Sequence, residues 1–344
     1  MYKLGINDNK FWRKDQLALH LYKCFIDNTP TTLVATPEGS NLEGCGVYRH
    51  LDMFCKQTGY AQENITIVTG NMIEQHNHYK IKRDATAWFE IPIIQKWLKS
   101  NNVETGNTPT LHFGHFIGKS NWNRLWVAAV LYNQYADKSF QTFNTGIGTH
   151  YLTKNDGLSD FVGLEDLIKN ECDRLPEVIT FLKTCPRFIP EEIEAIKNMA
   201  THIKQADYYP IQLPANLNIL QYYNNIFVDV VHETFVRGEV CFATEKTWRP
   251  IIARRPFITM GGRHHLANLR RLGFRTFNTV WDEGYDDYGM QHRIQEILKL
   301  LNTISQWTPA QLIDKLHSMQ HILDHNYEVF NSLTFDKVQA TFDA

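Results

Sequence analysis

The chain has 344 residues, of which 43% are apolar, 12% aromatic and 21% charged; this composition excludes a disordered or fibrous protein and fits two globular domains. Lysine and arginine total 35 against 37 Asp and Glu, so the net charge of -2 gives no long-range attraction to nucleic acid or to an anionic membrane. The N-terminus has no apolar signal-peptide segment and no run approaches the ~18 apolar residues that span a bilayer, so we expect a cytoplasmic protein without a membrane anchor.

The first third of the chain alternates apolar runs with helical periods, which is typical of βα units around a parallel sheet. Residues 31–36 (TTLVAT) and 64–69 (NITIVT) are predicted strands, and residues 17–26 and 47–54 carry apolar side chains at helical spacing. The polar segment 99–108 (KSNNVETGNT) precedes Pro109 and marks a domain boundary. We therefore expect an N-terminal α/β domain over residues 1–108.

The βα pattern begins again after this boundary and defines a second predicted domain over residues 109–305. Residues 111–117 and 139–143 are predicted strands, and residues 121–134 a predicted helix between them. Residues 159–204 are predicted to be a helical insert, because their helical stretches are interrupted only by prolines.

Residues 226–277 show the strongest βαβ pattern of the chain. It reads as strand NIFVDVV, helix TEKTWRPIIA, strand PFITMG, helix HHLANLRRLG and a short strand RTF over residues 275–277. From Thr308 onward, apolar residues at helical spacing predict a long helix, within a C-terminal helical segment over residues 306–344 that crosses back to brace the first domain.

The cysteines lack CxxC or Cys/His metal spacing, which predicts free thiols. They are Cys24, Cys45, Cys55, Cys172, Cys185 and Cys241.

The segment CFATEKTWRP contains the strongest site signal. Thr244 is a good N-cap for the following helix, and free backbone amides at a helix start attract anions. Lys246 and Thr247 add a charge and a hydroxyl to the same turn, and Glu245 supplies a carboxylate of the kind that binds a ribose diol. The segment thus predicts a phosphate site, with a capped helix bearing solvated charges as the alternative.

A second strand-to-helix turn, GKSNWNRLW, follows the predicted strand over residues 111–117. Ser120 is a plausible N-cap, Asn121 follows it, and Arg124 lies in the first helical turn. Ligands of open α/β sheets bind beyond the carboxyl ends of the strands, so two cationic turns in one domain can face one crevice. The alternative is that Arg124 is an ordinary surface charge.

Two acidic motifs are candidate metal sites. His232 and Glu233 follow a predicted strand, but no second histidine follows at helical spacing, so Glu233 is better placed as a polar ligand contact. The acidic cluster over residues 282–287 is not the Asp-x-Asp of metal-dependent sugar transferases. We therefore expect no metal ion and no other cofactor.

In their order along the chain, these segments resemble the family 10 glycosyltransferases, the α-1,3-fucosyltransferases. The segment FGHFIGKSNWNRLW is similar to that family's opening donor-domain strand with its Ser-Asn turn and arginine. The segment VDVVHETFVRGEVCFATEKTWRPIIARRPFITMGG is similar to its Phe-Glu-Asn segment, Thr-Glu-Lys signature and following strand, and FRTFNTVWDEGYDD to its later acidic strand end. The resemblance covers roughly residues 111 to 290.

This resemblance implies a GT-B architecture, in which two Rossmann-like domains face a central cleft and the C-terminal domain holds a nucleotide-sugar donor. Glu245 would contact the ribose, Lys246 and Arg124 the diphosphate, and Glu233 would lie near the transferred sugar, where it is also a catalytic candidate. Ser120, Asn121, Thr244 and Thr247 would complete the donor-binding turns. The chain reads His-Glu-Thr where the family has Phe-Glu-Asn, which leaves the donor sugar open. Without an anchor, such an enzyme is expected in a phage, viral or bacterial cytoplasm.

The acceptor-side base has to come from the N-terminal domain, where no resemblance guides its choice. Inverting transfer needs one group to take the proton of the acceptor hydroxyl. Glu38 and Glu74 each follow a predicted strand, at the ends that would face the cleft. Either is a candidate base, and an ordinary surface acid is the alternative for each.

The sequence thus predicts an inverting glycosyltransferase acting on a glycan, a small molecule or a hydroxymethylated DNA base. The basic residues Lys80 to Arg83 and Arg270 to Arg271 are available for phosphate contacts if the acceptor is DNA. Two alternatives are a non-catalytic nucleotide-binding protein and a nucleic-acid-binding protein with base-stacking aromatics such as Trp88, Phe89 and Trp122.

Overall fold

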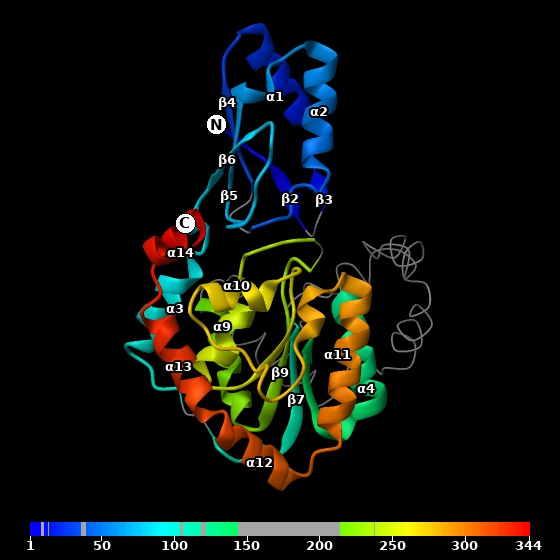
Figure 1. The fold of residues 1–344 in the computed structure, drawn as a ribbon, viewed down its shortest axis with the longest axis vertical. Coiled ribbons are helices and arrows are strands. Elements are labelled where there is room, and N and C mark those ends of the chain that lie inside the picture. Colours follow the sequence, from blue (N-terminus) through cyan, green and yellow to red (C-terminus); the bar gives the residue numbers. More distant parts are fainter. Residues whose placement is uncertain are drawn as a thin grey trace, which may run out of the picture.

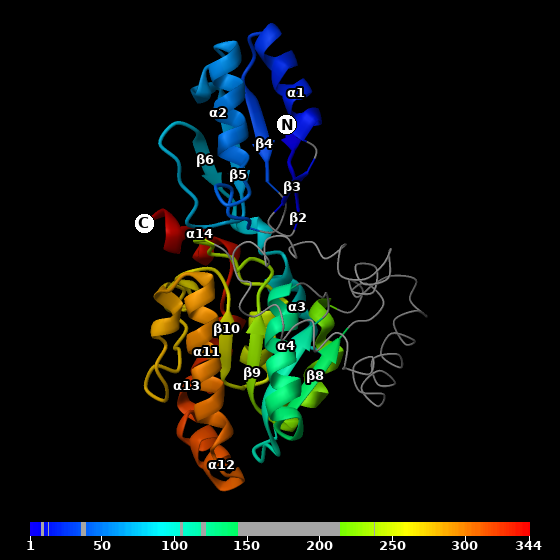
Figure 2. The same ribbon diagram turned by 90° about the vertical axis from the view of Figure 1, so that its right-hand side faces the viewer.

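The structure is a computed structural model that describes residues 1–7, 10–12, 14–35, 39–103, 106–117, 122–143, 214–236 and 238–344. These residues form a mixed α/β fold with two parallel four-stranded sheets, which lie one above the other along the long axis of the molecule (Figures 1 and 2). The α/β class predicted from the alternation of strands and helices is confirmed. None of the helices in this described part of the chain is long and apolar enough to cross a membrane.

The first sheet is built from the N-terminal residues. Its strands, in spatial order, are β1 (Tyr2–Lys3), β4 (Thr31–Val34), β5 (Ile65–Thr69) and β6 (Lys80–Arg83). A separate antiparallel pair consists of β2 (Gly5–Asn7) and β3 (Lys10–Trp12). Both predicted strands of this region, over residues 31–36 and 64–69, are present as β4 and β5.

The core of this first domain is a small cluster of buried side chains from two strands and two helices. The helices are α1 (Lys14–Ile26) and α2 (Val47–Thr58). Leu17 and Leu51 from these helices are fully buried with Leu33 and Ile67 from β4 and β5. Such helices at strand connections are what parallel strands require, because a tight hairpin cannot join them.

The second sheet contains the strands that the βαβ pattern predicted. In spatial order they are β10 (Phe257–Met260), β9 (Ile226–His232), β7 (Leu111–Ile117) and β8 (Ser139–Phe143). Every residue of β9 is buried. A strand covered on both faces has no polar face to alternate with, which explains why its sequence is almost continuously apolar.

Helices and 3₁₀ turns surround this sheet and share one large apolar core with it. The α-helices are α3 (Glu90–Leu98), α4 (Trp122–Tyr135), α9 (Glu245–Ile252), α10 (His265–Arg271) and α11 (Met290–Ser305). The 3₁₀ segments among the described residues are η1 (Gln62–Asn64), η2 (Ala85–Ala87), η3 (Ala136–Lys138), η5 (Pro214–Asn224) and η6 (Gly284–Asp287).

Helix α3 lies N-terminal to the predicted boundary at residue 108, yet it packs on the second domain. Trp88, Ile91 and Ile94 are buried in the large core, and Gln95 donates to the backbone of Phe330 and Leu333 at 2.6 and 2.9 Å. The chain therefore passes from one apolar core to the other soon after β6. The predicted helical insert over residues 159–204 lies outside the described residues.

The predicted short strand over residues 275–277 is wrong. Side chains satisfy this backbone in place of a neighbouring strand: Asn326 both donates to and accepts from the backbone of Arg275 at 2.8 Å, and Glu283 accepts from the amide of Phe277 at 2.7 Å. A segment whose polar groups are met in this way gains nothing from pairing with a strand.

The single long helix predicted after Thr308 is also wrong, because three helices replace it. They are α12 (Pro309–Ser318), α13 (Gln320–Asn331) and α14 (Phe335–Asp343). Helix α12 begins with a capping box between Thr308 and Gln311. Helix α14 reaches the first domain as expected, because Asp343 pairs with Arg83 of β6 at 2.9 Å (Figure 1).

Candidate functional site

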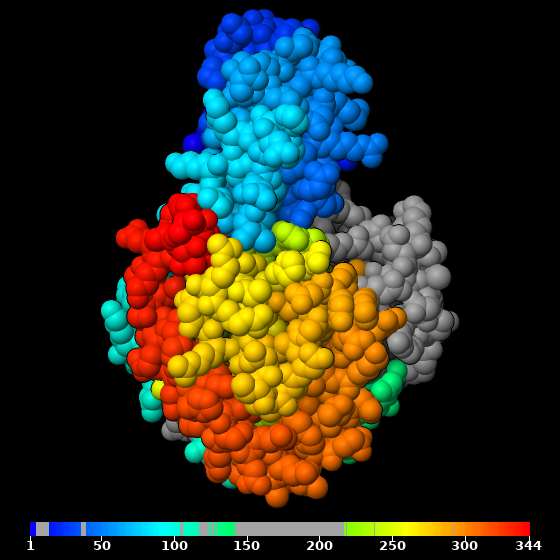
Figure 3. All heavy atoms as spheres, viewed as in Figure 1, coloured from blue at the N-terminus to red at the C-terminus, as the bar shows by residue number. Residues whose placement is uncertain are grey.

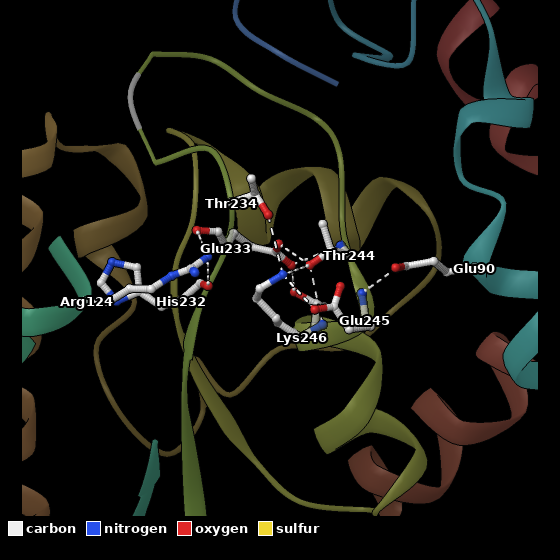
Figure 4. Close-up of polar contacts among 9 residues, drawn as sticks. Glu90, Arg124, His232, Glu233, Thr234, Thr244, Glu245 and Lys246 are labelled. Atoms are coloured by element: carbon white, nitrogen blue, oxygen red, sulfur yellow. Dashed lines mark hydrogen bonds and ion pairs between the residues drawn. The ribbon is translucent and has the colours of Figure 1, made fainter. Parts of the chain in front are cut away.

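The turn between β9 and α9 gathers most of the residues that the sequence singled out. Thr244 is the N-cap of α9, and its side chain accepts from the backbone amide of Lys246. Glu233 follows β9, and Glu245, Lys246 and Thr247 form the first turn of the helix (Figure 4). A buried strand followed by a capped amphipathic helix is what the local sequence encodes.

Glu233 is buried and ties the end of β9 to the start of α9. One carboxylate oxygen accepts from the amide of Thr244 at 3.1 Å and from the hydroxyl of Thr247 at 2.6 Å. The other oxygen accepts from the hydroxyl of Thr244 at 2.6 Å. These bonds give Glu233 a structural role in the turn. The sequence alone predicts that Glu233 acts near the transferred sugar and does not reveal this structural role.

Lys246 and Glu245 form an ion pair at 2.7 Å, and each side chain is only 14% exposed. The Lys246 ammonium also donates to the hydroxyls of Thr244 and Thr234 at 3.1 and 3.4 Å. Burial opposes ionisation of Glu245, but the charges of Lys246, Arg249 and Arg124 outweigh it and lower the pKa of Glu245 to about 2. Glu245 is therefore ionised at neutral pH.

Glu90 contacts this turn from another helix, and the sequence gives no sign of that contact. It is the first residue of α3, and its carboxylate accepts from the amide of Glu245 at 2.6 Å (Figure 4). Burial and the negative charges of Glu245 and Glu233 raise the pKa of Glu90, against the opposing effect of Lys246. No local pattern marks Glu90, because its partner lies 155 residues further along the chain.

The backbone amides at the start of α9 already have acceptors within the protein. The amide of Thr244 donates to Glu233, that of Glu245 to Glu90, and that of Lys246 to the Thr244 hydroxyl at 3.4 Å. In this conformation a phosphate group would therefore meet the Lys246 ammonium rather than open amides. The sequence correctly located a turn capped by Thr244, but the two carboxylates that occupy its other amides, Glu233 and Glu90, come from elsewhere in the chain.

Arg124 lies beneath the end of β9 and is buried. Its guanidinium donates to the backbone oxygens of His232 and Glu233 at 3.4 Å each. This placement joins α4 to the strand end that precedes the α9 turn, so the arginine is not the surface charge of the alternative interpretation.

Two buried histidines, His115 of β7 and His232 of β9, lie near Arg124 with their ring centroids 6.1 Å apart. Burial, together with the charge of Arg124, lowers the pKa of both imidazoles, and that of His115 falls to about 3. Both imidazoles are therefore neutral at pH 7.

Three of the predicted site residues lie outside the described residues. They are Glu38, Ser120 and Asn121. Of the two candidate bases, the structure therefore describes only Glu74.

Glu74 follows β5 and lies at the edge of the first domain that faces the second. Its carboxylate accepts from the Tyr48 hydroxyl at 2.8 Å and from the Asn71 amide at 2.9 Å. Burial raises the pKa of Glu74, and these two hydrogen bonds partly offset the effect. A carboxyl group whose pKa moves toward neutrality is suited to accept a proton.

The segment Gly238–Phe242, which precedes the α9 turn, connects the two domains. Asn71 of the first domain is buried, and its side chain bonds two residues of this segment. It accepts from the amide of Cys241 at 2.8 Å and donates to the carbonyl of Glu239 at 3.3 Å. The amide of Met72 donates to the carbonyl of Cys241 at 3.1 Å. The loops that follow the carboxyl ends of β5 and β9 therefore meet at one junction, with Glu74 on one side and the α9 turn on the other.

The acidic cluster over residues 282–287 is largely structural and not simply a solvated turn. Asp286 accepts from the amides of Leu266 and Ala267 at 3.0 Å each, which caps α10. Glu283 pairs with Arg270 at 3.1 Å.

Four of the residues proposed for nucleic-acid contact have other partners, whereas Phe89 is exposed. Trp88 is buried and donates to the carbonyl of Gly70 at 3.1 Å, so it cannot stack on a base. Arg83 pairs with Asp343, Arg270 with Glu283, and the Arg271 guanidinium lies 4.3 Å from the centroid of the Phe342 ring.

Cys24, Cys45, Cys55 and Cys241 are buried free thiols. Among the described residues, no three His, Cys, Asp or Glu side chains gather as metal ligands. Comparisons of the chain with protein-family models, curated proteins and solved structures give no match.

Proposed function

We propose that the chain is an inverting glycosyltransferase of GT-B-like architecture, which moves a sugar from a nucleotide donor to a hydroxyl acceptor. The observation that carries the proposal is the meeting of two parallel sheets at their carboxyl ends, where ligands of such sheets bind. A cationic turn lies on one side of this junction and a carboxyl group with a raised pKa on the other.

On the donor side, Lys246 is the group best placed to meet the diphosphate. Its partner Glu245 is ionised, so the carboxylate can accept hydrogen bonds from the ribose hydroxyls. A small part of the Glu245 side chain is exposed. Arg124 adds positive charge below the turn. As the sugar leaves, negative charge grows on the diphosphate, and fixed cations stabilise that charge without reorganising.

On the acceptor side, Glu74 is the proposed base. Nucleophilic attack by the acceptor oxygen on the anomeric carbon breaks the bond to the diphosphate and inverts the configuration, while the hydroxyl proton passes to the Glu74 carboxylate. No covalent intermediate forms, and no metal ion is required in this scheme. The acceptor is a glycan, a small molecule or a hydroxymethylated DNA base.

Non-catalytic nucleotide binding is a second candidate, favoured by the hydrogen bonds that hold Glu233, the acid expected near the transferred sugar, in the α9 turn. Such a protein would bind nucleotides and leave their sugars untouched.

The first test is a thermal-shift screen of nucleoside diphosphates and their sugars, with and without EDTA. A ligand at ~100 times its Kd adds about 2.7 kcal/mol to the free energy of unfolding, which is readily detected. We expect at least one nucleoside diphosphate to raise Tm equally with and without EDTA. If none does, the proposed function is wrong.

Steady-state kinetics with the donor found in this way then separates the roles. Lys246→Ala and Arg124→Ala should each lower kcat about a hundredfold, because their charges act most on the departing diphosphate. Glu245→Ala should chiefly raise the KM for the donor. Lys96→Ala, which removes an exposed cation on α3, is the matched control. Donor binding without turnover in the wild type would establish the second candidate instead.

A further inference from the structure

A pocket with a volume of about 340 Å³ lies between the segment over residues 280–288 and helix α11. None of the residues that line it belongs to the α9 turn. Figure 3 shows the face that these two segments form, in yellow and orange. Four aromatic residues line the pocket: Trp281, Tyr285, Tyr288 and Trp307. The volume falls within the range of small-molecule sites, roughly 300–1,000 Å³.

Trp281 lines this pocket and carries an unsatisfied polar atom. Its side chain is buried, at 7% exposure, and its indole Nε1 has no hydrogen-bond partner among the described residues. Leaving a buried N–H unpaired destabilises a fold, so such a donor marks a place where a further acceptor completes the bond.

The polar part of the pocket contains two carboxylates, those of Asp282 and Glu296, beside Lys299 and Thr303. Asp282 is exposed, and Glu296 is held in place by Lys299 at 2.6 Å and by His292 at 3.3 Å. Neighbours also order the aromatic rings: Trp281 contacts Phe277 with centroids 5.2 Å apart, and Tyr288 stacks on His292 at 3.9 Å. Side chains fixed in this way lose little entropy when a ligand binds.

We propose that this pocket binds a sugar ring of a glycan. A pyranose has a C–H-rich face that packs on aromatic rings, and hydroxyl groups around its edge that accept from an indole N–H and donate to carboxylates. An organic cation fits less well, because Lys299 lines the pocket and the Lys315 ammonium lies 4.7 Å from the centroid of the Trp307 ring. The inference goes beyond sugar transfer, since the pocket can hold a glycan whether or not the α9 turn does chemistry.

The test uses saturation-transfer NMR on the full chain with methyl glycopyranosides of glucose, galactose, mannose, fucose and N-acetylglucosamine as probes. We expect saturation of the ring C–H protons of at least one of them. Trp281→Phe keeps an aromatic ring and removes the N–H, so it should weaken binding about fivefold, the effect of one hydrogen bond. Thr303→Trp should fill the pocket and abolish binding. Trp97→Phe, on α3 and outside the pocket, is the matched control.

Binding of no glycoside, or equal binding by the wild type, Trp281→Phe and a folded Thr303→Trp, would overturn the inference. Binding of tetramethylammonium in place of the glycosides would overturn it too. If Thr303→Trp does not fold, Trp281→Phe alone decides. Glycoside binding that persists while no nucleoside diphosphate binds would refute the proposed transferase and leave this pocket as assigned.

Discussion

Glu90 places its carboxylate on the amide of Glu245, close to two other acids, Glu233 and Glu245. The charges of Lys246, Arg249 and Arg124 offset these acids, but a diphosphate would bring further negative charge next to Glu90. In the proposed function, the Glu90 carboxylate thus occupies the helix amide that a donor phosphate would otherwise meet. For a donor to bind, Glu90 has to turn away or carry a proton.

Glu90→Gln keeps an acceptor for the amide of Glu245 and removes the charge. Like charges in contact cost several kcal/mol, so we expect the variant to bind a nucleoside diphosphate at least about tenfold more tightly than the wild type at pH 8. Isothermal titration of both proteins at pH 6 and pH 8 measures this, with the exposed Glu328→Gln as control. Equal affinity at pH 8 would show that Glu90 does not obstruct the site.

The same variant can also be tested without a ligand, through the pH dependence of its stability. The pKa of Glu90 is raised in the folded state, so the folded protein keeps a proton that the unfolded chain loses above pH 4.5. The wild type should lose stability as the pH rises from 4.5 to the raised pKa, whereas Glu90→Gln lacks this loss. The Tm of the variant should thus exceed that of the wild type by an amount that grows over this pH window.

At the scale of single elements, several residues that the sequence marks as candidate site residues instead accept hydrogen bonds at the N-termini of helices. Asp286 accepts from two amides in the first turn of α10, and Glu233 accepts from the amide of Thr244, the N-cap residue of α9. Each closes a helix start with a carboxylate from another segment, which satisfies orphan amides and favours the helix dipole.

Asp286→Ala tests this role for α10. Removing a capping carboxylate typically costs about 1–2 kcal/mol of folding free energy, and the loss of two amide bonds places this variant at the upper end of that range. Urea unfolding measures the change. Asp287→Asn, whose side chain is 70% exposed, should alter stability far less. Equal effects of the two substitutions would contradict the capping role.

Elements with local signals were predicted well, and features that depend on remote residues were not. Strands β7 and β8 have the predicted bounds, because buried runs between turn residues identify them locally. The strand over residues 275–277 failed because Asn326, about fifty residues away in sequence, takes its hydrogen bonds. The same reason explains Glu90: the sequence locates Thr244, Glu245 and Lys246, but the carboxylate that meets their turn comes from a helix of unpredicted position.

At the scale of the whole molecule, the arrangement of the two domains depends on a short polar junction. Asn71 bonds the segment Gly238–Phe242 and also donates to Glu74 at 2.9 Å. One side chain therefore links the domain junction to the proposed base. Asn41 makes a similar bond to the carbonyl of Glu239 at 3.3 Å but has no bond to Glu74 among those of the described residues.

Asn71→Asp should separate these two functions. The aspartate can still accept from the amide of Cys241, so hydrogen exchange of that amide should stay slow, whereas Asn71→Ala should make it fast. A second carboxylate beside Glu74 raises the pKa of Glu74, and so does the loss of the amide that donated to it. Because a base acts only when deprotonated, the acid limb of the pH–rate profile should move to higher pH.

Asn41→Asp is the matched control, and its pH–rate profile should coincide with that of the wild type. If Asn71→Asp also left the profile unchanged while Cys241 stayed protected, the junction would be intact and Glu74 would not be the base. The proton of the acceptor would then have to pass to another group, and Glu38, after β4, is the other candidate of the first domain.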